Sequence, residues 1–115
     1  MLYGLENNEL EKIISVIAKN DRVEKAVLYG SRAKGTFRPF SDVDITLIGS
    51  RLQRYDLNSI ILAMDDLLLP YEFDISLFSE LKNENLIDHI NRVGVVIFQR
   101  VAEITDLQKN CKFGE

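Results

Sequence analysis

Two aspartates that could bind a metal ion, Asp42 and Asp44, lie ten residues after a Gly-Ser pair, Gly30-Ser31. Side chains alternate between the two faces of a strand, so both aspartates share one face of a strand that begins near them. Carboxylates are the hard oxygen ligands that Mg²⁺ prefers. A glycine at a strand end admits a ligand close to the backbone, and a serine that opens a helical turn offers a hydroxyl and free N–H groups to an anion. The pattern predicts metal-assisted phosphate chemistry.

A two-metal site would need a third carboxylate on a neighbouring strand. From Tyr71 to Leu77 the sequence alternates strictly between apolar and polar residues, which indicates a half-buried strand with Asp74 on its polar face. Pairing the two strands would place Asp74 beside Asp42 and Asp44. Glu72 is the alternative third carboxylate, although we expect it to be solvated at the strand end.

Three further polar residues invite a functional interpretation. Arg32 either contacts a phosphate or orients an acidic partner, or else it forms a salt bridge that fixes the turn. Ser41 either closes the turn before Asp42 or reaches a phosphate. His89, the single histidine, lies off the apolar stripe of its helix, so we expect a surface residue.

Apolar periodicity, together with capping and turn residues, predicts the helices and strands that position this site. We expect strands near 23–29, 42–47, 71–78 and 95–98, helices near 8–20, 56–69 and 83–93, and a short helical turn at 31–34 that ends at Gly35. Asp56 is the expected N-cap of the second long helix. The carboxylate-bearing strands would then have one apolar face for helices and one open polar face.

The composition bounds the class of protein. A chain of 115 residues with 46% apolar content supports a single domain, at residues 1–100, followed by a C-terminal tail at 101–115 that is flexible or binds a partner. The net charge of −4 comes without a basic run, so we do not expect nucleic acid as a partner. No leader or long apolar span is evident, and Cys111 is the only cysteine, which excludes an internal disulfide. We expect a soluble cytoplasmic protein that does not associate with membranes.

These motifs resemble the minimal nucleotidyltransferases of the DNA polymerase beta superfamily. Gly30-Ser31, ten residues, and Asp42-Val43-Asp44 match that family in type and spacing, and Asp74 falls at its third metal ligand. The resemblance extends from about Leu10 to Arg100. It implies an α/β (α+β) nucleotidyltransferase fold, in which helices pack on one face of a small mixed sheet and the acidic site occupies the other.

The resemblance also implies a reaction. Asp42, Asp44 and Asp74 would be both the catalytic residues and the ligands of two Mg²⁺ ions, and Asp74 is the candidate acceptor of the proton. Gly30 and Ser31, with Arg32 and Ser41 nearby, would bind the nucleotide. ATP would donate AMP to a hydroxyl, and pyrophosphate would leave.

Family members of this size are similar to antitoxins that pair with a helical HEPN-domain ribonuclease and adenylylate a tyrosine in it. A cognate HEPN protein in a hetero-oligomer is therefore the expected partner and acceptor. Two alternatives remain: a non-catalytic nucleotide-binding subunit that blocks its partner sterically, and transfer to a small-molecule hydroxyl with a helical subunit supplied in trans. The sequence does not identify the base of the nucleotide, the number of AMP units or the oligomeric state.

Overall fold

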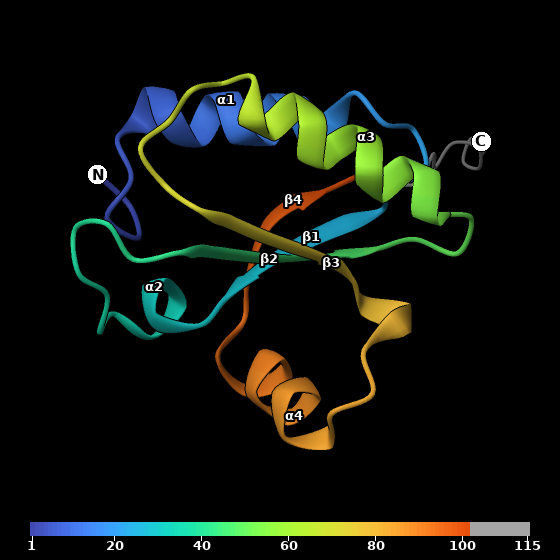
Figure 1. The fold of residues 1–115 in the computed structure, drawn as a ribbon. Coiled ribbons are helices and arrows are strands. Elements are labelled where there is room, and N and C mark those ends of the chain that lie inside the picture. The colour runs from blue at the N-terminus through green and yellow to red at the C-terminus, as the bar shows by residue number, and fades with distance from the viewer. Residues whose placement is uncertain (102–115) are drawn as a thin grey trace, which may run out of the picture.

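Helices and strands alternate along the chain in the computed structural model, which describes residues 1–101 (Figure 1). The elements in chain order are α1 (Asn7–Ala18), β1 (Lys25–Tyr29), α2 (Ser31–Lys34), β2 (Val43–Ile48), α3 (Arg54–Asp65), β3 (Phe73–Leu77), the 3₁₀-helix η1 (Phe78–Glu80), α4 (Glu84–Val93) and β4 (Val95–Gln99). The predicted turn at 31–34 is confirmed as α2, and Gly35 ends it with a left-handed backbone (φ 85°). The predicted tail lies, apart from Val101, outside the described residues.

The four strands form one mixed sheet in the order β3-β2-β1-β4. β1 pairs antiparallel with both β2 and β4, whereas β2 pairs parallel with β3. A parallel pair requires a crossover connection, and α3 supplies it. The mixed sheet that the sequence analysis predicts is therefore confirmed.

One face of the sheet is covered by α1 and α3, which lie side by side above it (Figure 1). Side chains alternate along each strand, so alternate positions of β1, β2 and β3 point toward these helices. The buried apolar residues of this core include Ile13, Ile17, Ala26, Leu28, Val43, Ile45, Leu47, Leu57, Ile60, Met64, Ile75 and Leu77.

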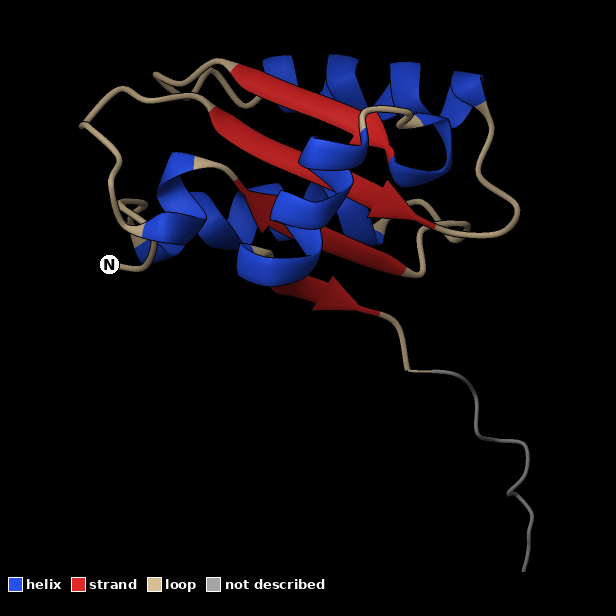
Figure 2. Cartoon of the chain, turned by 90° about the horizontal axis from the view of Figure 1, so that it is seen from below, coloured by secondary structure: helices blue, strands red, loops and turns tan. Residues whose placement is uncertain are grey.

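The opposite face, which the sequence analysis expected to be open, is partly covered by one more helix. Figure 2, seen from below, shows α4 crossing the strands on this side. Ile90 of α4 packs with Val27 and Tyr29 of β1 in a second, smaller apolar cluster. α4 therefore shares a face with the carboxylates, because Tyr29 and Asp44 are partners in the antiparallel register. Alternation within the strands predicts this face but not the helix that reaches it.

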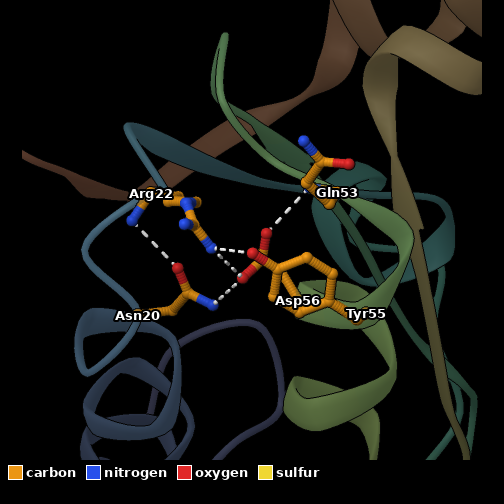
Figure 3. A network of polar contacts seen from close by, with 5 residues as sticks. All are labelled: Asn20, Arg22, Gln53, Tyr55 and Asp56. Atoms are coloured by element: carbon orange, nitrogen blue, oxygen red, sulfur yellow. Dashed lines mark hydrogen bonds and ion pairs between the residues drawn. The ribbon is translucent and has the colours of Figure 1, made fainter.

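A polar network joins the loop after α1 to the start of α3 (Figure 3). The buried Asp56 carboxylate accepts hydrogen bonds from Asn20 Nδ2 at 3.1 Å, Arg22 Nη1 at 3.2 Å and the Gln53 N–H at 2.8 Å. Burial alone would raise the pKa of Asp56, but these hydrogen bonds outweigh it and the pKa is lowered. The N-cap of α3 is Gln53 and not Asp56, which lies three residues inside and completes a capping box.

Within residues 1–101, no helix has the length and apolar character needed to cross a bilayer.

Candidate active site

Asp44 and Asp74 lie directly opposite each other on neighbouring strands. In the parallel register of β2 and β3 the two aspartates are partners, as the predicted pairing requires. Residues in register point to the same face, so both carboxylates lie on the face that α4 partly covers. Asp42 precedes β2 by one residue, and it is exposed, as is Asp74, whereas Asp44 is half-buried. Asp44 is thus partly shielded from solvent, and the other two carboxylates face it.

The environment of Asp44 disfavours its negative charge. Burial, and after it the charges of Asp74 and Asp42, together raise the pKa of this carboxyl to about 6. The Arg32 guanidinium opposes them by lowering the pKa. Like charges that raise the pKa of a carboxyl are a physical indication of a site that receives a cation.

The Gly30-Ser31 turn packs directly against this carboxylate. Gly30 adopts φ 77° and ψ −156°, a conformation that is essentially restricted to glycine. A Cβ atom at Gly30 would lie 2.2 Å from Asp44 Oδ2, so a side chain is excluded there. Ser31 then begins α2, whose first N–H groups have no partner within the helix. The turn and the carboxylates therefore form one continuous site.

Arg32 is buried next to this site and is not exposed at its surface. Only 1% of the residue is exposed, and its guanidinium donates to three backbone carbonyls: Tyr3 O at 2.9 Å, Pro39 O at 3.2 Å and Ser41 O at 2.9 Å from Nη2 and 3.2 Å from Nε. This placement differs from both functional interpretations of Arg32. The structure shows the turn being fixed through carbonyls in place of the salt bridge that the sequence suggested.

Ser41 closes the loop that leads to Asp42. Its hydroxyl accepts a hydrogen bond from the Arg38 N–H at 2.8 Å, and its carbonyl accepts from Arg32. Of its two predicted roles, closure of the turn is the one that these contacts display. Glu72, the alternative third carboxylate, is exposed beside the start of β3.

Two residues that the sequence analysis did not place in the site border it. The buried Tyr29 is the register partner of Asp44 on β1. Burial raises the pKa of its phenol, the charge of Asp74 adds to this, and a hydrogen bond with Ser76 works in the opposite direction. His89 of α4 is half-buried, which corrects the expected surface location, and its Nε2 accepts a hydrogen bond from the Gly30 N–H at 3.0 Å. The antiparallel pairing of β1 with β2 would have indicated that Tyr29 lies beside Asp44. No local sequence pattern indicates that His89 lies beside Gly30.

The donor set fits magnesium in the way that phosphate-transferring enzymes bind it. Among residues 1–101, no group of three or more His, Cys, Asp or Glu side chains is close enough to hold a metal ion by itself. Mg²⁺ is usually bound through one or two carboxylates together with waters and substrate phosphates, and not by a complete protein cage. Asp44 and Asp74 supply two carboxylates next to the Gly30-Ser31 turn.

Solved structures share this architecture. A toxin–antitoxin structure with AMP-PNP has a chain with a TM-score of 0.66 and 19% identity, over 85% of this chain and 78% of that one. A chain of the tri-AMPylated HEPN toxin complexed with an MNT antitoxin, from Shewanella oneidensis, has a TM-score of 0.62 and 14% identity, over 84% and 74%. A chain of the toxin–antitoxin MntA-HepT has a TM-score of 0.61 and 15% identity, over 83% and 74%. At these identities the similarity establishes the fold.

The sequence itself identifies the family. Comparison with curated proteins gave no match. The profile of the family described as Polymerase beta, Nucleotidyltransferase matches residues 11–103, which include the Gly30-Ser31 turn and all three aspartates. The chain therefore belongs to the polymerase beta nucleotidyltransferase family.

Proposed function

We propose that this nucleotidyltransferase transfers AMP from ATP to a tyrosine hydroxyl of a cognate helical HEPN-domain protein. The observation that carries the proposal is the register pairing of Asp44 with Asp74 directly beside Gly30. This arrangement places paired carboxylates next to the first N–H groups of α2, a combination that suits transfer from a nucleoside triphosphate.

In the proposed reaction the acceptor oxygen attacks the α-phosphorus of ATP. A new P–O bond forms, the bond to the β-phosphate breaks, and pyrophosphate leaves. Gly30 and Ser31 bind the β- and γ-phosphates and leave the α-phosphorus accessible in line with the acceptor. Asp74, which is exposed and adjacent to Asp44, takes the proton of the acceptor hydroxyl.

Magnesium is the proposed metal, with Asp42, Asp44 and Asp74 as its ligands in a site for two ions. When bound, Mg²⁺ neutralises the phosphate charge and lowers the pKa of the acceptor hydroxyl. Arg32 has a positioning role in this proposal, because its donors hold the carbonyls of Pro39 and Ser41 just before Asp42.

Two observations support a protein acceptor. Asp42 and Asp74 are exposed, so a side chain of a partner can approach the carboxylates from solvent. The neighbour from Shewanella oneidensis is an MNT antitoxin in complex with a tri-AMPylated HEPN toxin. A shared fold makes a helical HEPN partner the first acceptor to test.

Labelled ATP distinguishes adenylyl transfer from other outcomes. The chain is incubated with the product of the neighbouring open reading frame, Mg²⁺ and ATP labelled either at the α- or at the γ-phosphate. Adenylyl transfer labels the partner from α-labelled ATP only, and the Asp42→Asn/Asp44→Asn double variant abolishes the label. Label from γ-labelled ATP would indicate phosphoryl transfer and contradict the proposal. A stable complex without label would favour steric blocking, and label on added small alcohols alone would favour a small-molecule acceptor.

A further inference from the structure

His89 of α4 contacts the Gly30-Ser31 turn and is not one of the three carboxylates of the site. Its Nε2 atom lies 3.0 Å from the backbone nitrogen of Gly30, 59 residues away in the sequence. A backbone N–H can only donate, so Nε2 must be the unprotonated nitrogen, and in a neutral imidazole Nδ1 then carries the proton. The contact fixes the direction of the Gly30 N–H and therefore the orientation of the peptide plane between Tyr29 and Gly30.

Packing of α4 determines where the imidazole lies. Ile90, the next residue, is 4% exposed within the cluster that contains Val27 and Tyr29. At the end of the helix, a Cβ atom on Gly94 would lie 2.6 Å from Val27 Cγ1, so α4 approaches β1 closely. The His89 ring also meets the Tyr29 ring edge-on, with centroids 6.2 Å apart at 79°. The His89 imidazole, which accepts the hydrogen bond, is thus positioned by the packing of α4 on β1 and by its contact with the Tyr29 ring.

The Asp44 carboxylate also restricts the position of Gly30. Asp44 Oδ2 occupies the space where a Cβ would be, so the turn cannot move toward the carboxylate without a collision. The His89 hydrogen bond from α4 and the Asp44 carboxylate of β2 both constrain the backbone that leads into Ser31. The Gly30 N–H is also committed to His89, which leaves the N–H groups at the start of α2 as the donors for phosphate.

We propose that His89 is a positioning residue for nucleotide binding: it holds the Gly30-Ser31 turn in the conformation that accepts the triphosphate. The inference rests on the proposed function, because it concerns the same site. Loss of this partly buried hydrogen bond is expected to weaken nucleotide binding about three- to tenfold. The effect falls on affinity and on the KM for ATP, with a smaller effect on kcat, because His89 does not touch the reacting atoms.

Calorimetric titration of the full chain with AMP-PNP and Mg²⁺ measures this effect without requiring transfer. His89→Ala is expected to weaken binding by about three- to tenfold, and His89→Gln, whose amide oxygen can accept the same hydrogen bond, is expected to recover most of the affinity. Asn91→Ala is the matched control, because Asn91 is an exposed residue of the same helix. Thermal unfolding of each variant identifies any loss of folding.

The Gly30 amide proton gives an independent spectroscopic signature. In the wild-type NMR spectrum it is expected downfield of its position in His89→Ala, since the substitution removes its acceptor. Equal AMP-PNP affinity for wild type and His89→Ala, or an unchanged Gly30 amide shift, would overturn the positioning role alone. A folded wild-type chain that binds no AMP-PNP would overturn the proposed function itself.

Discussion

The Asp44 carboxylate lies between Asp74 on β3 and Tyr29 on β1 and is half-buried. Its pKa is raised from 3.8 to about 6, first by burial and then by its acidic neighbours. Such a group is ionised at neutral pH only at a cost to the fold, and a bound cation would remove that cost. The residue proposed as central to catalysis is therefore expected to destabilise the metal-free protein.

Asp44→Asn is expected to stabilise the metal-free chain at neutral pH while abolishing transfer. At roughly 1.4 kcal/mol per pKa unit the shift corresponds to about 3 kcal/mol, which solvent screening reduces to about 1–2 kcal/mol. Urea unfolding in the presence of EDTA measures the gain. Asp42→Asn is the matched control, because Asp42 is exposed and its substitution is expected to change stability by less than about 0.5 kcal/mol. An Asp44→Asn variant that is less stable than wild type would contradict this interpretation of the site.

The pH dependence of that gain has a definite sign. The folded state binds the Asp44 proton more tightly than the unfolded state, so the contribution of Asp44 to stability falls as the pH rises from about 4 to about 6. The difference in unfolding free energy between Asp44→Asn and wild type should therefore grow over this window and level off above it. A difference that is constant with pH would show that the pKa of Asp44 is not raised.

At the scale of elements, the β1–α2 turn depends on glycine for two separate reasons. Gly30 and Gly35 both have positive φ, but only Gly30 has no space for a side chain. An alanine at Gly35 would introduce backbone strain alone, whereas an alanine at Gly30 would introduce strain and a collision with Asp44.

Gly30→Ala should destabilise the fold by about 1–3 kcal/mol through backbone strain, with a further 1–3 kcal/mol from overpacking, and should abolish transfer. Gly35→Ala, with nothing within 4 Å of its new Cβ, should cost only about 1–2 kcal/mol and retain activity. Urea unfolding and the transfer assay report the two effects. Equal losses for both variants would show that the contact of the turn with Asp44 is unimportant.

The loop between α2 and β2 is organised around Arg32. Besides its four hydrogen bonds to carbonyls, the guanidinium lies 4.8 Å from the Tyr71 ring centroid and 5.3 Å from that of Phe37. A planar fork can satisfy several carbonyls and stack on rings at once, which an ammonium group cannot do.

Arg32→Lys is accordingly expected to destabilise the chain by about 2–4 kcal/mol, although the charge is retained. The carbonyls of Pro39 and Ser41 would lose donors, and the approach to Asp42 would loosen. Chemical denaturation compares it with Lys34→Ala, an exposed position on the same short helix, for which a change within about 0.5 kcal/mol is expected. Wild-type stability in Arg32→Lys would refute the positioning role.

At the scale of the whole molecule, local patterns predicted most elements and the placement of Asp74 on a polar strand face. The alternation from Tyr71 to Leu77 fixes which face Asp74 occupies, whereas strand pairing sets the register that makes it the partner of Asp44. Contacts between distant elements were not predictable in this way. The His89–Gly30 hydrogen bond depends on where α4 docks, and the burial of Arg32 depends on a loop that closes over it. Periodicity carries no information about either arrangement.

The proposed reaction takes place between this chain and a HEPN partner. The exposed Asp42 and Asp74 leave the site accessible to that partner. The most direct measurement is the intact mass of the HEPN partner after co-expression with this chain and incubation with Mg²⁺ and ATP. The account predicts a gain of one or more AMP units on a tyrosine of the partner, absent with the Asp42→Asn/Asp44→Asn variant. A stable complex whose partner keeps its unmodified mass would contradict it.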